Sequence, residues 1–406
     1  MKCLVIGGGA AGLMAGCALA RGGAEVVILE RQARVGRKLL ATGNGRCNFT
    51  NTAAGPEYYA GSRREISAVL RQYPAQRVLE IFEEMGVPGV VDGEGRVYPG
   101  SNQASSVLDA LRLTLAEAGG REETGFDVVS IEKKKSEFLL TSADGRREKS
   151  RKVLLAAGSP AAPHLGGTAA GVELLKKFGH RAEDFRPILT PLTTETEPIR
   201  GLKGLRVRCQ ATLLEGETVV CRESGEALFS ENGVSGICVM QLSRHLRGLK
   251  QPRLELNFVP AYAQSALFER ARRLEMRRLE DFLNGMLPKK LGICLMRRIG
   301  LSDLDRTAGS LSRREMSALW NAMSRFSLKI TGTCGFDHAQ AASGGLDLAD
   351  FSAETLESRK VPGLYAAGEV LNVDGDCGGF NLQWAWASAL TAAEAMLREN
   401  DGILGR

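Results

Sequence analysis

The sequence predicts an α/β domain built from both ends of the chain, with a β-rich module and a helical module inserted into it. Three observations predict this class. A glycine-rich turn joins an apolar strand to a helix near the start, a second strand–glycine–helix unit closes the chain after residue 363, and the residue pattern changes character twice in between. At 406 residues, the chain is also longer than one hydrophobic core normally serves, so we expect two or three domains.

The first 30 residues predict a strand–helix–strand unit. Lys2–Ile6 is an apolar run, Leu13–Arg21 is a helical pattern closed by two glycines, and Glu25–Leu29 is a second apolar run. Consecutive parallel strands with a helix between them form a right-handed crossover. Residues 3–20 carry no charge but contain five glycines, so they do not form the continuous apolar helix of a signal peptide.

The later elements follow from periodicity and turn residues. Before residue 160 we expect helices at 63–73, 75–85 and 104–118, and strands at Phe126–Ile131, Phe138–Ser142 and Val153–Ala156. From about 188 to 260, short runs separated by turns predict a small antiparallel sheet or barrel, with strands at Thr190–Thr196, Arg206–Leu214, Val219–Arg222 and Leu254–Phe258. Residues 261–330 are mostly helical in pattern and 330–345 are turn-rich. The chain then forms the strand Gly363–Ala367, a glycine loop and the helix Leu382–Arg398.

Composition excludes several classes of protein. The apolar fraction of 44% and the charged fraction of 25% are those of an ordinary globular protein, not of a disordered or coiled-coil chain. No stretch supplies the roughly 20 apolar residues of a membrane span. The nine cysteines include no Cys-x-x-Cys pair, and the four histidines show no metal-ligand spacing. We therefore expect a cytoplasmic protein without a metal and without a membrane partner.

The net charge of +6 is concentrated in one segment. Between residues 261 and 330, 14 Arg and Lys stand against 7 Asp and Glu, so this segment carries +7 and the rest of the chain −1. Such an excess attracts nucleic acid or anionic surfaces. Here the arginines alternate with apolar residues in the pattern of an amphipathic surface helix. We therefore favour a solvated helical face and expect no nucleic-acid partner.

Gly7-x-Gly9-x-x-Gly12 is the fingerprint of a dinucleotide-binding turn. The first glycine allows the tight turn, the second lets the backbone approach a pyrophosphate, and the third lets helix and strand pack closely. The phosphates then lie at the N-terminus of the helix, whose free N–H groups and dipole favour an anion. Glu30 ends the next strand 18 residues after Gly12, where its carboxylate is placed to accept hydrogen bonds from ribose hydroxyls.

The other end of the chain favours FAD over NAD. The strand Gly363–Ala367 ends in Gly368 and Glu369, and the glycine-rich segment 374–381 opens the last helix. An extended FAD needs such a second site, because its flavin end reaches across the sheet to a second helix N-terminus. The only other glycine-rich candidate, 166–171, lacks the second glycine of the fingerprint, so we expect no stable NAD(P)H domain.

Four further stretches carry a family resemblance. They are Arg37–Asn51, Arg96–Pro99, Leu228–Gly236 and Gly378–Trp386. Together they resemble a bacterial flavoprotein family of NAD(P)/FAD-dependent oxidoreductases that includes a 3-dehydro-bile-acid Δ(4,6)-reductase and an aminoacetone oxidase. The resemblance spans nearly the whole chain. It implies a Rossmann-like FAD-binding domain of the glutathione-reductase type, with an inserted β-barrel and a helical domain.

The domain boundaries expected on this basis are discontinuous. They are 1–188 with 345–406 for the FAD-binding domain, 189–260 with 330–344 for the β-barrel-like domain, and 261–329 for the helical domain.

The resemblance also implies, position by position, which residues hold a non-covalent FAD. The pyrophosphate turn consists of Gly7, Gly9, Ala10, Ala11 and Gly12, and the adenosine is contacted by Glu30, Arg31 and Val128. The loop along the phosphates and the flavin consists of Arg37, Lys38, Thr42, Gly43, Asn44, Gly45, Arg46, Cys47 and Asn48. The strand ends contribute Ala157, Gly158, Gly368 and Glu369, and the flavin ring is held by Asp376, Gly378, Gly379, Phe380 and Asn381. Ala157 departs from the family pattern, in which a threonine is usual, and this removes a hydroxyl.

The sequence assigns no catalytic residue. The candidates near the flavin are Cys47, Asn48, Tyr98 and Asn381. Cys47 and Cys377 both lie in loops expected to touch the flavin, so a redox pair or a covalent link is conceivable, but loop packing is favoured.

The expected function is that of an FAD-dependent oxidoreductase. We favour the NAD(P)H-linked reduction of a small, unsaturated, enone-like organic substrate, with NAD(P)H visiting the flavin transiently. The alternative is an oxygen-dependent amine oxidase of the aminoacetone-oxidase type, disfavoured because no aromatic cage or carboxylate cluster for a cationic amine is evident. A flavin-dependent tRNA-modifying or nucleic-acid-binding protein is a third reading. The sequence does not indicate an oligomeric state.

Overall fold

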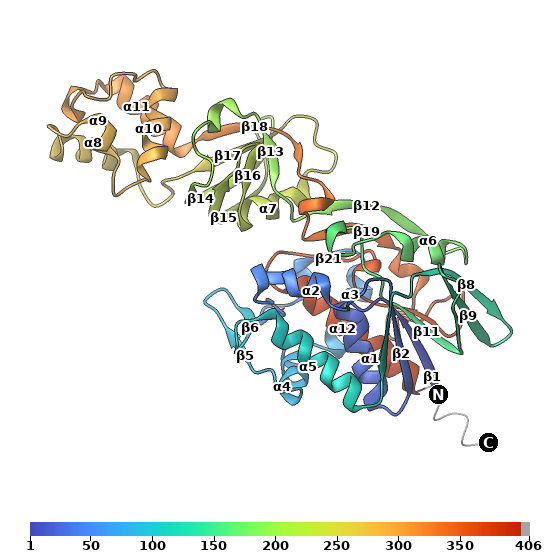
Figure 1. The fold of residues 1–406 in the computed structure, drawn as a ribbon. Coiled ribbons are helices and arrows are strands. Elements are labelled where there is room, and N and C mark those ends of the chain that lie inside the picture. The colour runs from blue at the N-terminus through green and yellow to red at the C-terminus, as the bar shows by residue number, and fades with distance from the viewer. Residues whose placement is uncertain (399–406) are drawn as a thin grey trace. The chain divides into compact units, whose positions relative to one another are not determined.

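The computed structural model describes residues 1–398, which divide into two compact units (Figure 1). Unit 1 comprises Met1–Pro187 and the chain from Gln340 onward, and unit 2 comprises Ile188–Ala339. Residues 399–406, which the sequence assigned to the FAD-binding domain, lie outside the described residues. The architecture is the predicted α/β fold with a β-barrel and helices. The separation of barrel and helices into two domains stays a prediction.

Unit 1 is built on a five-stranded parallel sheet. Its strands, in spatial order, are β20 (Leu364–Ala366), β11 (Lys152–Leu155), β1 (Lys2–Ile6), β2 (Glu25–Glu30) and β7 (Arg121–Thr124). β11 and β20 are buried at every position, as expected for parallel strands covered on both faces. Since β20 comes from residue 364 and β1 from residue 2, both ends of the chain build this sheet, as predicted.

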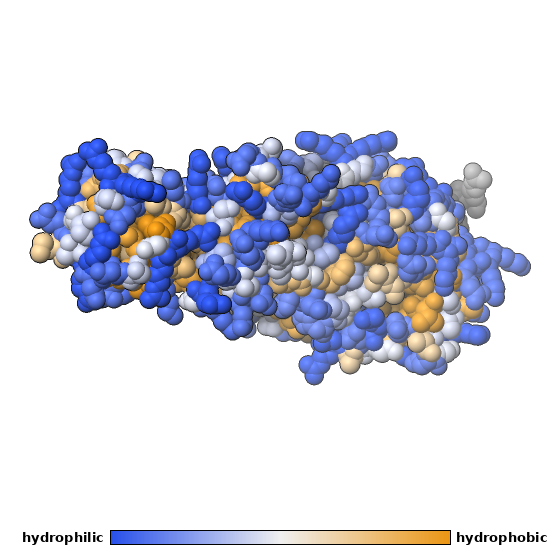
Figure 2. Space-filling model, turned by 90° about the horizontal axis from the view of Figure 1, so that it is seen from above, coloured by the Kyte–Doolittle hydropathy of each residue, from blue (hydrophilic) through white to orange (hydrophobic). Residues whose placement is uncertain are grey.

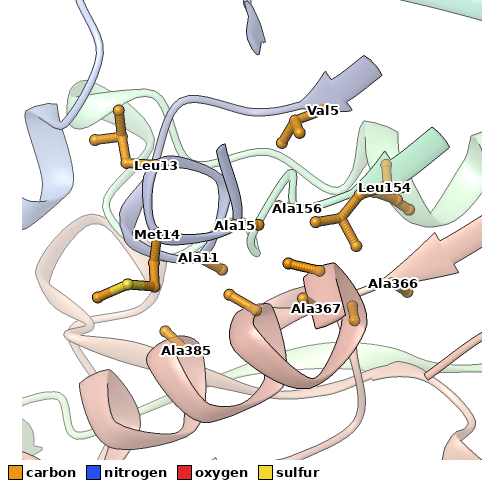
Figure 3. Close-up of a cluster of buried hydrophobic side chains, with 14 of the residues drawn as sticks. Val5, Ala11, Leu13, Met14, Ala15, Leu154, Ala156, Ala366, Ala367 and Ala385 are labelled. Atoms are coloured by element: carbon orange, nitrogen blue, oxygen red, sulfur yellow. The ribbon is translucent and has the colours of Figure 1, made fainter. Parts of the chain in front are cut away.

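Two long helices cover one side of this sheet and pack against each other. They are α1 (Ala10–Arg21) and α12 (Phe380–Arg398), and α1 also contacts α5 (Ala104–Glu117). Ala11, Ala15 and Ala385 lie where α1 and α12 meet, beneath Val5 of β1 (Figure 3). The distance between packed helices depends on the side chains at the contact, so these alanines allow a close approach. The other side of the sheet carries an antiparallel sheet (Figure 1).

The remaining elements of unit 1 are short. The antiparallel sheet has strands β8 (Val128–Lys134), β9 (Glu137–Ser142) and β10 (Arg147–Ser150). A second three-stranded sheet has the order β3 (Thr50–Asn51), β6 (Arg96–Pro99) and β5 (Gly89–Val91). Two further sheets have two strands each: β4 (Tyr59–Ala60) pairs with β21 (Asp374–Gly375), and β12 (Ala182–Ile188) pairs with β19 (Ala341–Leu346). The other α-helices are α2 (Arg37–Ala41), α3 (Arg63–Gln72), α4 (Ala75–Glu84) and α6 (Ala170–Lys176).

Unit 2 contains a closed six-stranded antiparallel barrel. Around the barrel its strands are β13 (Leu192–Thr194), β16 (Gly233–Ser235), β15 (Thr218–Phe229), β14 (Arg206–Glu215), β17 (Pro252–Asn257) and β18 (Phe326–Thr333). Closure leaves no unpaired sheet edge. The predicted β-rich run from 188 to 260 therefore supplies five of the six strands.

Five α-helices complete unit 2. They are α7 (Ile237–Leu242), α8 (Gln264–Arg273), α9 (Leu279–Phe282), α10 (Lys289–Arg298) and α11 (Arg313–Ser324). A capping box starts α11, because the Ser312 hydroxyl accepts the Glu315 N–H and the Glu315 carboxylate accepts the Ser312 N–H.

The predicted helical segment 261–329 extends too far, since β18 begins at Phe326. Residues 326–330 alternate between buried and more exposed positions, which is the period of a strand, and this signal follows directly on the helical pattern. The turn-rich reading of 330–345 likewise missed the end of β18 and the start of β19.

Within residues 1–398, no helix is both long and apolar enough to cross a bilayer. Figure 2 shows one face that is mainly hydrophilic, with hydrophobic residues in small groups.

Candidate functional site

A cavity lies at the carboxyl ends of the parallel strands in unit 1, where open α/β sheets bind their ligands. It holds about 1070 Å³ of space free of atoms, part of it open to solvent. Segments that follow β1, β2, β11 and β20 line it, together with the first turns of α1 and α12. The cavity therefore collects residues from both ends of the chain.

The three glycines of the first turn are required for two different reasons. A Cβ on Gly7, whose φ is +105°, would lie 2.4 Å from the Ala156 carbonyl oxygen, and one on Gly12 would lie 1.8 Å from the Gly7 oxygen. Both positions thus need glycine for the packing of the turn itself. A Cβ on Gly9 would meet no protein atom within 4 Å, and Gly9 lines the cavity. Gly9 therefore keeps space free for something other than protein.

The N-terminus of α1 is left open toward the cavity. Its N-cap residue is Gly9, and no side chain caps the first turn. The first N–H groups of a helix have no partner within the helix, and the helix dipole adds a partial positive charge there. Ala10 and Ala11 line the cavity beside these groups. The arrangement suits a phosphate or pyrophosphate.

Glu30 joins this cavity to a second, smaller one. Its carboxylate accepts the Gly8 N–H at 2.7 Å and the Gln32 N–H at 2.7 Å, so its position at the end of β2 is fixed. Arg31 and Val128 line the second cavity, as Glu30 also does. The buried Nε of Arg31 has no hydrogen-bond partner among the described residues, so the donor is available to a ligand.

An ion pair links the two halves of unit 1 at the cavity. The Lys38 Nζ lies 2.7 Å from a Glu369 carboxylate oxygen, and both residues line the cavity. The other Glu369 oxygen accepts the Ala342 N–H at 3.0 Å. Arg37 also lines the cavity and donates to the His164 carbonyl oxygen at 3.0 Å. Two cationic side chains thus line the same cavity as the open end of α1.

The loop after α2 has a strained backbone. Gly43, Asn44 and Gly45 have φ of +58°, +56° and +82°, and Cys47 has φ of +60°. Asn and Gly tolerate this left-handed region, whereas Cys rarely adopts it. Cys47 is fully buried, and burial raises the pKa of its thiol to about 12, so it stays a protonated, poorly nucleophilic thiol at neutral pH. The structure therefore favours a packing role for Cys47 over a redox one.

Arg46 and Asn48 flank this buried cysteine. The Arg46 guanidinium lies 4.7 Å from the centroid of the Tyr98 ring, and its Nε donates to the Gly43 oxygen at 3.1 Å. The Oδ1 atom of Asn48 is buried and has no hydrogen-bond partner among the described residues. A buried polar atom without a partner is unusual, and this oxygen is free to accept a hydrogen bond from a ligand.

This loop lies directly beside the glycine loop before α12. A Cβ on Gly379 would lie 2.4 Å from the Thr50 oxygen, and the Asn51 amide donates to the Gly378 oxygen at 2.9 Å. The Asn381 side chain accepts the Gly375 N–H at 2.8 Å and donates to the Gly375 oxygen at 2.9 Å. Residues more than 320 apart in sequence thus form one surface beside the start of α12.

Tyr58 and Tyr59 pack on the same loop. The Tyr59 hydroxyl donates to the Phe380 oxygen at 2.9 Å, and burial raises its pKa well above the ordinary value. The Tyr58 ring stacks on Phe380 with centroids 4.5 Å apart. The Tyr59 hydroxyl is thus committed to structure, and the Tyr58 ring is held by stacking.

The cavity collects about half of the predicted FAD residues. Those that line it or the adjoining smaller cavity are Gly7, Gly9, Ala10, Ala11, Glu30, Arg31, Arg37, Lys38, Thr42, Val128, Ala157, Gly158, Glu369 and Asn381. Those that do not are Gly12, Gly43, Asn44, Gly45, Arg46, Cys47, Asn48, Gly368, Asp376, Gly378, Gly379 and Phe380, and the catalytic candidate Tyr98 is also outside. Their assignment to FAD stays a prediction.

Sequence reasoning missed several lining residues. They are Gln32, Arg34, Gly36, Ser159, Leu165, Gly166, Gly167, Gln340, Val373, Leu382, Trp384 and Ala385. Gly166 and Gly167 had been noted only as an incomplete fingerprint. Their position after a buried parallel strand was a usable signal, because such loops meet at the same edge of the sheet.

FAD fits the residues that are present. The open end of α1, the space at Gly9 and the cations beside it suit a pyrophosphate, Glu30 suits a ribose, and the free Nε of Arg31 and the unpaired Oδ1 of Asn48 need polar partners. Within residues 1–398, no cluster of His, Cys, Asp and Glu could hold a metal ion, and all nine cysteines are free thiols.

Comparison with known proteins identifies a family and two kinds of relative. A family model described as the HI0933-like protein Rossmann domain matches residues 1–395. The chain is 36% identical over 404 residues to the 3-dehydro-bile acid delta(4,6)-reductase of Clostridium scindens, covering 96% of this chain and 98% of that protein. It is 28% identical over 404 residues to the ribosomal RNA dihydrouridine synthase of Haemophilus influenzae, covering 98% of each.

A solved structure shares the fold. The 3-ketosteroid-delta4-(5alpha)-dehydrogenase of Rhodococcus jostii RHA1 superimposes with a TM-score of 0.51 over 97% of each chain, at 15% sequence identity.

Proposed function

The chain belongs to the HI0933-like Rossmann family and is an FAD-dependent oxidoreductase, and we propose that it uses NAD(P)H to saturate a carbon–carbon double bond conjugated to a carbonyl. One observation carries the proposal. The cavity at the strand ends combines an uncapped helix N-terminus, a glycine that leaves open space and the carboxylate of Glu30. When bound, FAD supplies hydride transfer at its flavin ring.

The cofactor is held by backbone and charge. The first N–H groups of α1 bind the pyrophosphate, and the space at Gly9 lets it approach the backbone. Lys38 adds a positive charge, while Glu369 holds that lysine in position. Glu30 accepts the ribose hydroxyls with its remaining lone pairs. The Arg31 Nε donates at the adenosine end.

We propose Tyr98 as the proton donor, although its side chain does not line the cavity described above. Saturating the double bond adds a hydride to one carbon and a proton to the other, so a donor must face the substrate. The Tyr59 hydroxyl is less suitable, because it donates to the backbone oxygen of Phe380. The Arg46 guanidinium lies over the Tyr98 ring, 4.7 Å from its centroid, and this contact holds the ring in place.

A small enone is the first candidate substrate. The relative with the highest identity reported above is named for the reduction of a 3-dehydro-bile acid, a 3-keto compound whose double bonds are conjugated to the carbonyl. NAD(P)H then visits the flavin transiently, since the fingerprint at Gly7–Gly12 is the only complete one in the sequence.

A uracil in ribosomal RNA is the second candidate substrate. The observation that favours it is the name of the Haemophilus influenzae relative, which covers the chain as fully as the bile-acid enzyme does. The bond reduced in dihydrouridine formation is also a carbon–carbon double bond conjugated to a carbonyl. The same reduction therefore applies to both candidate substrates, which differ in the molecule that contains the double bond.

Anaerobic turnover tests the proposal. Purified protein is incubated with NAD(P)H and either a 3-keto-4-ene steroid or ribosomal RNA that lacks dihydrouridine, and products are measured by mass spectrometry. The proposal requires a gain of two hydrogens in one substrate, matched by nicotinamide oxidation. Gain in the steroid alone identifies a small-molecule reductase, and gain in RNA alone identifies the second candidate. Gain in neither, with active flavin present, contradicts the proposal.

A further inference from the structure

The helices of unit 2 expose cations that have no acidic partner. Of the seven acids between 261 and 330, the ion pairs use four, and they neutralise Arg278, Lys289 and Arg306. Arg272 and Arg273 end α8, Arg277 lies four residues further on, and Arg313 and Arg314 begin α11. We call these last five arginines the basic surface.

All five arginines of the basic surface are exposed. Within residues 1–398, none of their side chains forms an ion pair or a side-chain hydrogen bond. By contrast, the Arg270 beside them donates to the Phe282 and Asn284 oxygens at 2.7 and 2.5 Å. Arg270 is therefore structural, and the five others are free to bind a ligand.

Backbone hydrogen bonds connect the two segments that carry the basic surface. The Ala308 N–H donates to the Arg277 oxygen at 2.8 Å, and the Gly309 N–H donates to the Glu275 oxygen at 2.8 Å. Arg313 follows four residues after Gly309, at the start of a helix that contacts α8. The turn after α8 and the start of α11 thus belong to one region of unit 2.

The charges of this region act on one another. The pKa of the Arg270 guanidinium is lowered by burial and then by the positive charges of Arg277 and Arg273. Like charges held together repel, and an anionic partner removes that cost. The cluster therefore favours a ligand with several negative charges.

The apolar residues of the segment do not need an outside partner. From the sequence we expected a solvated amphipathic helical face and, on that ground, no nucleic-acid partner. In the structure Leu267, Leu279, Phe282 and Leu283 are buried in the core of unit 2, so that core is the partner. The arginines are left on the surface without a packing role.

Two further side chains suit unpaired bases. Met276, between Arg273 and Arg277 in sequence, is 80% exposed, and Tyr262 is 49% exposed. Tyr262 is close enough to Arg270 to affect its pKa. Aromatic side chains stack on bases, and cations track the phosphate backbone, in proteins that bind single-stranded nucleic acid.

We propose that the basic surface binds RNA, with its arginines on phosphates and Tyr262 and Met276 against unpaired bases. This inference rests on the second candidate of the proposed function, because an RNA substrate needs a binding surface much larger than the site of reduction.

Filter binding to protein-free ribosomal RNA at about 0.15 M salt tests the proposal. The test variant is Arg272→Glu/Arg273→Glu/Arg277→Glu. The matched control is Arg147→Glu/Lys149→Glu/Lys177→Glu, which reverses three exposed cations in unit 1. A third variant with glutamines in place of the three α8-end arginines removes the charge without reversing it, and thermal unfolding shows that each variant is folded.

The proposal expects the test variant to bind RNA at least tenfold more weakly and the control to bind as the wild type does. The plot of log affinity against log salt concentration should become less steep, its slope decreasing in magnitude by about 2 to 3, because each lost phosphate contact reduces that magnitude by about 1. Equal loss in the control, no binding by the wild type, or tighter binding to phosphatidylserine vesicles would overturn it.

The two proposals fail separately. If the wild type reduces a steroid enone but binds no RNA, the basic surface is wrong and the proposed reduction stands. If RNA binds through the basic surface but gains no hydrogen, the surface stands and the second candidate substrate is wrong.

Discussion

Replacing Gly9 by alanine separates cofactor binding from folding. The added Cβ meets no protein atom within 4 Å, and Gly9 has an ordinary φ of −84°, so the fold should accept the change. The same Cβ enters the space where the pyrophosphate approaches the N–H groups of α1. Loss of one charge-assisted hydrogen bond costs about 1.5–3 kcal/mol. FAD should therefore bind about 10- to 150-fold more weakly.

The assay compares FAD affinity and apoprotein stability in the same preparations. Affinity is measured by titrating apoprotein with FAD and following flavin fluorescence, and stability by thermal unfolding without FAD. Gly93→Ala is the matched control, because its Cβ also meets no protein atom within 4 Å and its residue lies away from the cavity. Wild-type FAD affinity in Gly9→Ala would refute the placement of the pyrophosphate.

Four further predictions follow from the same geometry. Gly12→Val should abolish flavin retention and lower the melting temperature, because a Cβ there lies 1.8 Å from a backbone oxygen; a stable, fully yellow variant would contradict this. Lys38→Met should weaken FAD binding several-fold with little change in apoprotein stability, as titration would show, whereas an unchanged affinity argues against a role for this charge. Acid precipitation should release the flavin into the supernatant, and colour left in the pellet would mean a covalent link, with Cys47 or Cys377 suspected. Burial lowers the pKa of His180 from its ordinary 6.5, so the unfolded chain binds more protons than the folded chain just below pH 6.5, and the free energy of unfolding should fall there. His180→Gln should flatten the pH dependence of the free energy of unfolding, measured with urea. An unchanged pH dependence in this variant would exclude His180 as its source.

The FAD-binding fold could be predicted from the sequence because its signals are local. Gly7, Gly9 and Gly12 stand next to an apolar strand and a helix, and the strand ending in Glu369 repeats this pattern near the other end of the chain. Each motif carries its own physical reason, so none depends on knowing distant contacts. The barrel was visible as a run of short strands for the same reason.

Other features depend on contacts that no local pattern reveals. The strand β18 follows α11 after a single residue, and its alternation was lost in the helical pattern before it. The ion pair of Lys38 with Glu369 joins residues 331 apart, and the unpaired Oδ1 of Asn48 appears only once its surroundings are folded. The basic surface could be inferred only from the structure, because only the structure shows which apolar residues of the segment are buried in the core of unit 2.

Anaerobic reoxidation of the reduced protein tests the central claim most directly. The flavin is reduced with a limiting amount of NADPH or NADH, and its absorbance is followed after adding a 3-keto-4-ene steroid, a uridine-containing ribosomal RNA, or buffer. The account predicts that one unsaturated substrate restores the oxidised spectrum faster than buffer and appears as its saturated product. Reoxidation by oxygen alone, together with reduction of the flavin by an amine such as aminoacetone, would contradict it and identify an oxidase.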